Sequence, residues 1–411
     1  MTRPAEPDRA RFRDVLGVAE FRVLLLAQAQ SRAGDQLARV ALALLVFGQT
    51  SSAVLTTLVY ALTYLPPLLT APLLAGLADL YPRRTVLAVT DLVRAAVVAP
   101  MAVPGVPLPV VAILLVAMTC PQPLFAAARN AVLPGVLAGD RFPVGMSIVN
   151  VTDFISQIAG FTLGGVVVAL LGGPHVALLA DAVTYLVSAG LVWRGIGPHR
   201  PPATRTAAGG RTRFALAGIG LLAADRRLAG LAGLIWLYGL YLAPAALSAP
   251  YAHQIGAPKA VVGLLTAADL PGAVLGSLLV ARIRPAIRRR LMIPLAVVTG
   301  MPLIATAAAP PLPVTLLLWA VSGMLASYVT LAQAAFTLTV PDALRARAIG
   351  AASAGLQTSQ GLGVLLAGAV AQVISPSASI AVCAAAGVAG AVLIALTMLR
   401  PRRRPAPATA A

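Results

Sequence analysis

Two aspartates lie deep inside apolar segments of this chain and could bind and release a proton. Asp153 and Asp269 each lie about ten residues into a long apolar run, and neither has an arginine within one helical turn. A charged group in lipid is energetically costly, so a carboxylate there is expected to have a partner or a task. A buried carboxyl without a fixed cation is suited to changing its protonation state near neutral pH. Both residues are therefore candidate proton-coupling sites. The alternative for each is a carboxylate hydrogen-bonded to a neighbouring helix, and that is also the role we expect for a third buried acid, Asp181.

A polar stripe lies closer to the N-terminus. Gln28, Arg32, Asp35 and Arg39 are spaced by four, three and four residues, which places them on one face of a helix. Lipid would penalise such a face, so we expect it to line a central cavity. The stripe has two main interpretations: a structural ladder of ion pairs, or a surface for substrate contact or gating. Proton carriage by Asp35 is a third, which its two flanking arginines disfavour.

A short charged turn separates two apolar runs. Asp79 precedes the pair Arg83 and Arg84, and Asp91 and Arg94 follow one turn apart at the start of the next run. An aspartate at a helix end can cap the next helix and can pair with arginine. Pairs of this kind would hold one conformation of the protein and break in another. The alternative is a set of arginines that fixes the topology beside a solvated acid.

The glycines of one apolar run also have a regular spacing. Gly160, Gly164 and Gly165 lie in the stretch GFTLGG. Small residues four apart let two helices approach closely. We interpret them as helix-packing glycines.

The composition is that of an integral membrane protein. Of 411 residues, 59% are hydrophobic and only 11% are charged, against about 25% charged in soluble domains. A spanning helix needs about 20 mostly apolar residues, and this rule predicts twelve spans. The predicted spans are 20–48, 53–76, 84–103, 107–128, 143–171, 175–195, 228–251, 259–281, 291–308, 312–337, 346–374 and 378–399.

The arginines predict the orientation of these spans. They cluster at both termini and in every second connection, which by the positive-inside rule places both termini in the cytoplasm. The longest break between spans is rich in Pro, Gly, Thr and Arg and divides the chain into two six-helix halves. The expected segments are a cytoplasmic N-terminal segment (1–19), a first bundle (20–195), a cytoplasmic linker with an amphipathic helix (196–227), a second bundle (228–399) and a basic cytoplasmic tail (400–411).

Several function classes find no support in the residues. The net charge of +18 comes from short arginine clusters between apolar runs, a topological pattern and not a nucleic-acid-binding face. Neither a P-loop nor an HExxH or GxSxG motif occurs. The two cysteines are far apart and offer neither a disulfide framework nor a metal site. We expect no cofactor, no metal and no enzymatic activity, although a lipid-modifying enzyme or a non-transporting scaffold remains an alternative.

The charged turn carries a resemblance to a known family. The stretch AGLADLYPRR resembles the loop motif G-x-L-a-D-r-x-G-r-r, which follows the second helix in the major facilitator superfamily. The matching positions are Leu77, Asp79, Arg83 and Arg84, and the departures are Ala75, Leu80 and Pro82. The chain is most similar to the macrolide-efflux and enterobactin-exporter-like branch of drug:proton antiporters, on the stretches RAGDQLARVALALLVF, YLPPLL, TDLVRA and DAVTYLVSA.

The resemblance implies an all-α membrane fold of two pseudo-symmetric six-helix bundles. It also implies a latch at the cytoplasmic surface, formed by Asp79, Arg83, Arg84, Asp91 and Arg94. It also implies a transporter of the cell membrane that exports an amphipathic small molecule, such as a drug, a secondary metabolite or a siderophore-like compound, in exchange for protons. The expected partners are this substrate, protons and the lipid bilayer, with the protein acting as a monomer. A symporter or uniporter of a small metabolite is the alternative within transport.

Overall fold

The structure is a computed structural model that describes residues 12–74, 77, 80–199, 220, 225–341 and 344–399. Throughout these residues the chain forms helices joined by short turns, and the described part contains no strand. Asp79 lies outside the described residues, and so do the N-terminal segment up to residue 11, most of the expected linker and the basic tail.

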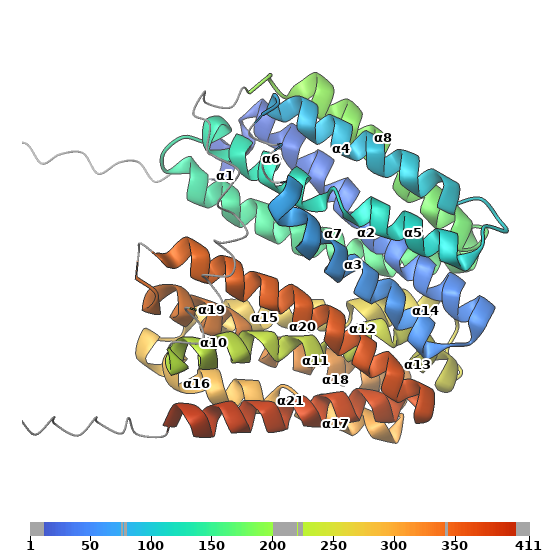
Figure 1. The fold of residues 1–411 in the computed structure, drawn as a ribbon, viewed down its shortest axis with the longest axis vertical. Helices are drawn as coiled ribbons and strands as arrows, with labels where there is room; N and C mark the ends of the chain where they lie inside the picture. Colours follow the sequence, from blue (N-terminus) through green and yellow to red (C-terminus); the bar gives the residue numbers. More distant parts are fainter. Residues whose placement is uncertain are drawn as a thin grey trace, which may run out of the picture.

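The helices form two groups that follow one another in sequence (Figure 1). The first group contains α1 (Phe12–Leu16), α2 (Ala19–Thr50), α3 (Ala53–Leu74), α4 (Arg83–Met101), α5 (Leu108–Thr119), α6 (Gln122–Val136), α7 (Arg141–Leu170) and α8 (Pro174–Gly195). The second contains α10 (Arg226–Trp236), α11 (Tyr238–Tyr241), α12 (Ala243–Ala246), α13 (Ser248–Gln254), α14 (Ala260–Ala267), α15 (Asp269–Arg282), α16 (Pro285–Val298), α17 (Met301–Ala305), a 3-10 turn (Thr306–Ala308), α18 (Leu312–Leu325), α19 (Tyr328–Thr339), α20 (Arg345–Val373) and α21 (Pro376–Leu399).

Proline interrupts some stretches that the sequence analysis treats as single spans. The predicted span 228–251 is divided into α10, α11, α12 and α13, and two prolines, Pro244 and Pro250, lie in its second half. Proline lacks the N–H that continues a helix, and its ring clashes with the preceding turn. Pro121 likewise lies between α5 and α6. The stretches Leu108–Val136 and Arg226–Ala246, which contain these interruptions, are still each long and apolar enough to cross a membrane.

Within the described residues, nine helical stretches are long and apolar enough to span a membrane. Three other long helices, α2, α4 and α20, are not among them. In α2 and α4, charged residues lie within the helix and not only at its ends. In α2 these include Arg32, Asp35 and Arg39 of the polar stripe. The chain is therefore a multi-pass membrane protein with some unusually polar helices.

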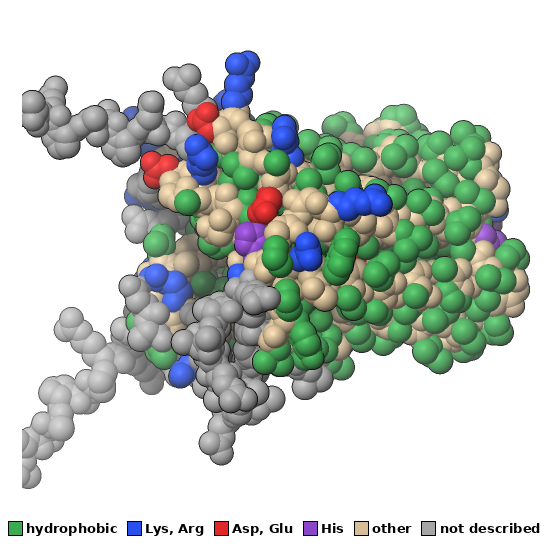
Figure 2. Space-filling view, turned by 90° about the horizontal axis from the view of Figure 1, so that it is seen from above, with side chains coloured by type: hydrophobic (Ala, Val, Ile, Leu, Met, Phe, Trp, Pro, Cys, Tyr) green, Lys and Arg blue, Asp and Glu red, His purple; other side chains and the backbone are tan. Residues whose placement is uncertain are grey.

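The surface agrees with this description. Figure 2 shows hydrophobic side chains over most of the visible face, whereas charged side chains gather toward one end. In Figure 1 this is the end at which α2 and α7 begin and at which α3 and α15 finish. We call it the charged end. A long apolar flank with charges at one end is the surface expected of a helical bundle in a bilayer.

The two groups pack against each other through glycines far from the charged end. At Gly165 of α7, an added Cβ would lie 2.4 Å from the backbone oxygen of Ala260 in α14. At Gly263 of α14, it would lie 2.0 Å from the backbone oxygen of Phe161. A second contact joins α20 to α3, where an added Cβ at Gly368 would meet the Thr57 side chain. Only residues without a side chain let these helix backbones come so close.

Candidate functional site

A cavity of about 1120 Å³ lies between the two groups of helices. Its walls come from α2, α3, α4, α6 and α7 on one side and from α10 and α20 on the other. On α20 the lining runs from Arg347 to Leu362, that is, from the start of the helix at the charged end to its middle. The Gly368 contact with α3 lies farther along the same helix. The cavity therefore lies toward the charged end, and the close helix contacts lie beyond it.

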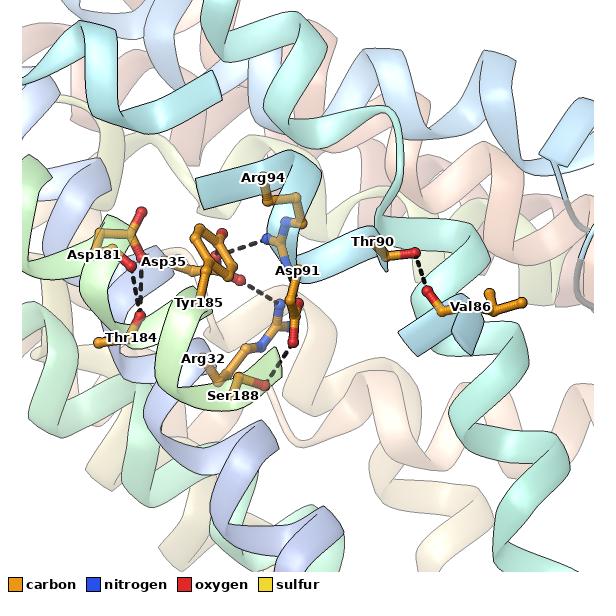
Figure 3. Close-up of polar contacts among 10 residues, drawn as sticks. All are labelled: Arg32, Asp35, Val86, Thr90, Asp91, Arg94, Asp181, Thr184, Tyr185 and Ser188. Atoms are coloured by element: carbon orange, nitrogen blue, oxygen red, sulfur yellow. Dashed lines mark hydrogen bonds and ion pairs between the residues drawn. The ribbon is translucent and has the colours of Figure 1, made fainter. Parts of the chain in front are cut away.

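One residue of the predicted polar stripe, Asp35, belongs to a buried ion pair in the cavity wall. The Asp35 carboxylate in α2 accepts a hydrogen bond of 2.7 Å from Nη2 of Arg94 in α4. The Tyr185 hydroxyl of α8 donates to the same carboxylate oxygen. Arg32 lies farther away, with 3.8 Å between its Nη1 and Asp35 Oδ2. Figure 3 shows these side chains converging from three helices.

The network continues behind the wall through Asp91. Ser188 of α8 donates a hydrogen bond of 2.5 Å from its hydroxyl to Asp91 Oδ2. The other carboxylate oxygen lies 3.9 Å from Nη1 of Arg94. The Arg94 guanidinium also stacks over the Tyr185 ring, at 4.2 Å from the ring centroid. The structure thus groups Asp91 and Arg94 with Asp35 in the middle of the first bundle, and not with the arginines of the charged turn.

A third carboxylate, that of Asp181, lies beside this pair. It is fully buried, and the Thr184 hydroxyl is 3.4 Å from its Oδ1. Its other oxygen, Oδ2, has no hydrogen-bond partner in the described part of the chain. Gly34 makes room for it, because an added Cβ there would lie 2.5 Å from Asp181 Oδ1. The sequence analysis expected Asp181 to tie helices together, and it did not connect this acid to Asp35.

The charges of this buried cluster do not balance. We define the cluster as Asp35, Asp91, Asp181 and Arg94, each at most 7% exposed. Three ionised carboxylates against one guanidinium would leave an excess of negative charge away from water, which is strongly unfavourable. Arg32 supplies partial compensation from the cavity side, where its side chain is 39% exposed. Protonation of a carboxyl in the cluster would relieve this imbalance.

The two predicted coupling acids lie in different places. Asp153 of α7 lines the large cavity and accepts a hydrogen bond of 2.5 Å from the Gln28 side-chain amide. Asp269 begins α15 in the second bundle and does not line that cavity. It borders a separate small pocket with Tyr241, Trp319 and other residues. The α15 and α18 backbones meet at this point, since an added Cβ at Gly323 would lie 2.0 Å from the Asp269 backbone oxygen.

The fourth member of the stripe, Arg39, lies deeper than the cavity. Its guanidinium lies over three aromatic rings, at 5.8 Å from Tyr60, 5.6 Å from Tyr64 and 6.0 Å from Phe161. Such distances are within the range of cation–π attraction. The stripe therefore divides in position: Gln28, Arg32 and Asp35 line the cavity, and Arg39 packs among aromatics beyond it.

The arginines of the charged turn make contacts within the first bundle. Arg83 donates from its side chain to the Ala131 carbonyl of α6, and its backbone N–H donates to the His199 carbonyl at 3.0 Å. Arg84 lies over the Trp193 ring at 4.7 Å. The remaining latch residue, Asp79, is outside the described residues. These contacts join the start of α4 to α6, to α8 and to the segment after α8.

The three predicted packing glycines all face neighbouring helices. Besides the Gly165 contact with α14, an added Cβ at Gly160 would lie 2.2 Å from the Ala33 backbone oxygen, and one at Gly164 would lie 3.1 Å from Leu37 Cα. Gly160 and Gly164 therefore allow α7 to pack closely against α2. No group of three His, Cys, Asp or Glu that could hold a metal ion occurs among the described residues.

One feature of α8 could have been found from the sequence. Asp181, Tyr185 and Ser188 are spaced by four and three residues, which places them on one helical face. The same spacing drew attention to the stripe of α2. Two polar faces of this kind in otherwise apolar helices are expected to turn toward each other, because lipid would penalise either one.

Comparison with known proteins gives a consistent result. The family model of the Major Facilitator Superfamily matches residues 24–250 and 229–411. No curated protein sequence matches significantly.

Several solved structures share the fold. A mutant form of the nucleoside transporter NupG is 16% identical, covering 92% of this chain and 99% of its own, with a TM-score of 0.73. A peptide transporter POT in complex with sulfate is 11% identical, covering 96% of each chain, with a TM-score of 0.72. A bacterial homologue of the iron transporter ferroportin in an inward-facing state is 14% identical, covering 92% of this chain and 97% of its own, with a TM-score of 0.69.

Proposed function

The chain belongs to the major facilitator superfamily, and we propose that it is a secondary transporter that exports an amphipathic small molecule in exchange for protons. The observation that carries this proposal is the cavity of about 1120 Å³ between the two helix groups, which lies at one end of the molecule while glycine contacts close the other. A site reached from one side at a time is what alternating access requires. The proposed location is the cytoplasmic membrane, with the protein acting as a monomer.

We further propose the topology predicted from the sequence, with twelve spans and both termini in the cytoplasm. The polar helices α2, α4 and α20 supply the three spans that apolarity alone does not identify, because all three contribute to the cavity wall. The bundles are residues 20–195 and 228–399, joined by the linker 196–227, with the segments 1–19 and 400–411 at the termini. In this topology the charged end faces the cytoplasm, as the positive-inside rule expects, and the cavity is open inward.

We propose that a buried carboxyl group carries the coupling proton. The charge imbalance of the buried cluster supports proton exchange at Asp35, Asp91 or Asp181. Asp153 and Asp269, which the sequence singles out, are further candidates. Asp153 lies in the cavity itself, where loading a proton would change the charge that a substrate meets. These features favour the drug:proton antiporter branch over a uniporter, which needs no buried acid.

Uptake into inverted membrane vesicles tests the proposal. An exporter should accumulate members of a panel of amphipathic dyes of either charge, and a protonophore that collapses the gradient should abolish the accumulation. Accumulation that persists unchanged without the gradient would refute proton coupling. A requirement for a gradient of the opposite direction would favour the symporter instead.

Substitutions of the candidate acids then identify the residue that carries the coupling proton. Asp153→Asn, Asp269→Asn and Asp181→Asn are each compared with Asp140→Asn, a control at an exposed residue that precedes α7. The variant that lacks the coupling acid should lose gradient-driven accumulation and keep downhill movement of the dye. Full gradient dependence in all three variants would mean that another acid carries the coupling proton, and Asp35 would be the next residue to test.

A further inference from the structure

We propose that the turn between α15 and α16 binds the phosphate head group of an anionic phospholipid. The segment 282–290, which contains this turn, has five arginines and no acid. Three of them, Arg282, Arg284 and Arg290, are exposed, and we call these three the arginine patch. The inference requires only that the apolar flank of the protein lies in a bilayer, and it is independent of what the protein transports.

The arginine patch has no partner of opposite charge. Within the described part of the chain, none of its three guanidiniums forms an ion pair or a side-chain hydrogen bond. Exposed arginines that begin other helices follow an acid directly: Asp140 precedes Arg141 of α7, and Asp225 precedes Arg226 of α10. A cluster of cations without acids at a membrane surface attracts anions from outside the protein.

The lipid-facing side of α15 leads directly to the patch. Residues spaced by three, one and three positions share one face of this helix: Leu275, Leu278, Leu279 and Arg282. The three leucines are between 46% and 59% exposed, and no residue of α15 lines the large cavity. Exposed leucines outside the cavity face the hydrocarbon of the bilayer. Arg282, the last residue of α15, therefore lies where the hydrocarbon ends.

The exposed side of α16 has the same arrangement in the opposite direction. Residues spaced by three, four and four positions are all exposed: Ile287, Arg290, Pro294 and Val298. No residue of α16 lines the large cavity either. Arg290 thus has an exposed apolar residue about one turn before it and another about one turn after it. A guanidinium at such a position extends toward the level of the phosphate groups, because acyl chains would penalise its charge.

Arg288 holds the turn that carries the patch. Its Nε donates a hydrogen bond of 2.6 Å to the Ile283 carbonyl, and its Nη2 donates to the Ala281 carbonyl. These bonds satisfy carbonyls at the end of α15, where no further helical turn follows. Arg288 therefore has a structural role, and it leaves Arg282 and Arg284 on a preformed turn. A preformed site loses less conformational entropy when a ligand binds.

The chemistry and the position of the patch both favour a phospholipid. A guanidinium presents paired N–H donors that match two oxygens of a phosphate. The charged side chains gather toward one end of the molecule (Figure 2), and α15 finishes at that end (Figure 1). With its phosphate on the patch, a lipid would lay its acyl chains along the exposed leucines of α15. A free phosphate ion would make no use of that apolar surface.

Lipid binding to the full-length protein tests the inference. Native mass spectrometry of the protein in a neutral detergent, titrated with dioleoyl phosphatidylglycerol or dioleoyl phosphatidylcholine, gives a dissociation constant for each lipid. The two lipids have the same acyl chains and differ in the charge of the head group. Each basic residue near a membrane surface contributes about fivefold to the attraction of anionic lipid. We therefore expect phosphatidylglycerol to bind at least about tenfold more tightly.

Substitution of the patch should remove this preference. The test variant combines three changes: Arg282→Gln, Arg284→Gln and Arg290→Gln. The control variant removes three exposed arginines of other helices: Arg141→Gln, Arg226→Gln and Arg227→Gln. Both variants lose the same net charge. The test variant should bind the two lipids within about twofold of each other, and the control variant should keep most of the preference.

A fluorescent label beside the patch locates the bound lipid. Bimane is attached to Ile287→Cys of the protein in nanodiscs, in a chain whose two native cysteines are replaced by alanine. Phosphatidylglycerol with brominated acyl chains should quench this label more strongly than brominated phosphatidylcholine at the same mole fraction. A label at Leu186→Cys, an exposed position of α8, should be quenched equally by the two lipids. Comparing the lipids at each site removes the effect of depth in the bilayer.

Four results would overturn the inference. They are equal affinity of the unsubstituted protein for the two lipids, an unchanged preference in the test variant, an equal loss in the control variant, and equal quenching of the label at Ile287→Cys. A patch that binds only free inorganic phosphate would give no preference in any of these lipid measurements. None of them involves transport, so the proposed function is tested separately.

Discussion

The close contact between α7 and α14 makes a single methyl group a sharp test of the structure. An added Cβ at Gly263 would lie 2.0 Å from the Phe161 backbone oxygen and 2.9 Å from the Gly165 backbone nitrogen. Ordinary van der Waals contact begins at 3.4 Å. The obstructing atoms belong to the backbone, so no side-chain rotation can relieve the clash. Gly263→Ala must therefore push the two helices apart or distort one of them.

The expected size of the effect follows from overpacking. Forcing an extra methyl group into close-packed structure costs about 1–3 kcal/mol. If the clash exists only while the halves are closed at this end, the same energy shifts the conformational equilibrium by about 5–150-fold toward the open form. If the halves cannot separate here, it appears instead as a lower Tm. A shift in the conformational equilibrium would mean that the two halves separate at this contact during the transport cycle. A lower Tm without such a shift would mean that they stay together here.

Distances between spin labels report which of these occurs. Labels at Gln49 and Ser375 would lie on opposite halves, near the end of α2 and just before α21, where Ser52 hydrogen-bonds Gln372 across the interface. The two native cysteines are replaced by alanine beforehand. We expect Gly263→Ala to increase the population with long distances.

The matched control is Gly190→Ala in α8, where an added Cβ meets nothing within 4 Å. It makes the same chemical change in a helix and should leave the distances as they are. If Gly263→Ala changed neither the distance distribution nor the Tm, the reasoning from the α7–α14 contact would be refuted.

Two further substitutions test the buried cluster. Arg94→Gln should lower the free energy of unfolding by about 3–5 kcal/mol, because it leaves a buried carboxylate uncompensated; adding Asp35→Asn should recover part of that loss, and an equal loss in the double variant would argue against the pair. Gly34→Ala should lower the Tm because its Cβ would lie 2.5 Å from Asp181 Oδ1, whereas Gly48→Ala has nothing within 4 Å and should not. Thermal unfolding of the purified protein measures both, and a similar Tm for the two glycine variants would contradict the close approach of α2 to α8.

Long apolar runs were the most predictable part of the fold. The predicted span 143–171 corresponds to α7, and the span 175–195 corresponds to α8, with ends that differ by at most two residues. Membrane spans are predictable because lipid offers no partner for backbone polar groups, so an apolar run of sufficient length forms a helix. The family resemblance in the charged turn was also correct at the level of the superfamily.

Contacts between residues far apart in sequence were the least predictable part. The sequence places Asp91 and Arg94 next to the charged turn and predicts that they belong to a latch there. In the structure Arg94 reaches Asp35, which is 59 residues away. Helical periodicity gives the face on which a residue lies but not the helix that this face meets. Charge pairing between helices therefore had to come from the structure.

The same physics explains why the polar helices α2, α4 and α20 all contribute to the cavity wall. A charge is tolerated inside a bilayer only where it faces other polar groups or a water-filled cavity. Arg32, Asp35 and Arg94 therefore force α2 and α4 to the cavity side of their bundle, and both helices fall outside the set that hydropathy identifies. Apolar helices such as α21 face lipid on their outer sides without any such constraint. In a chain of this composition, a segment that fails the test of apolarity between two segments that pass it is the first place to look for the substrate path.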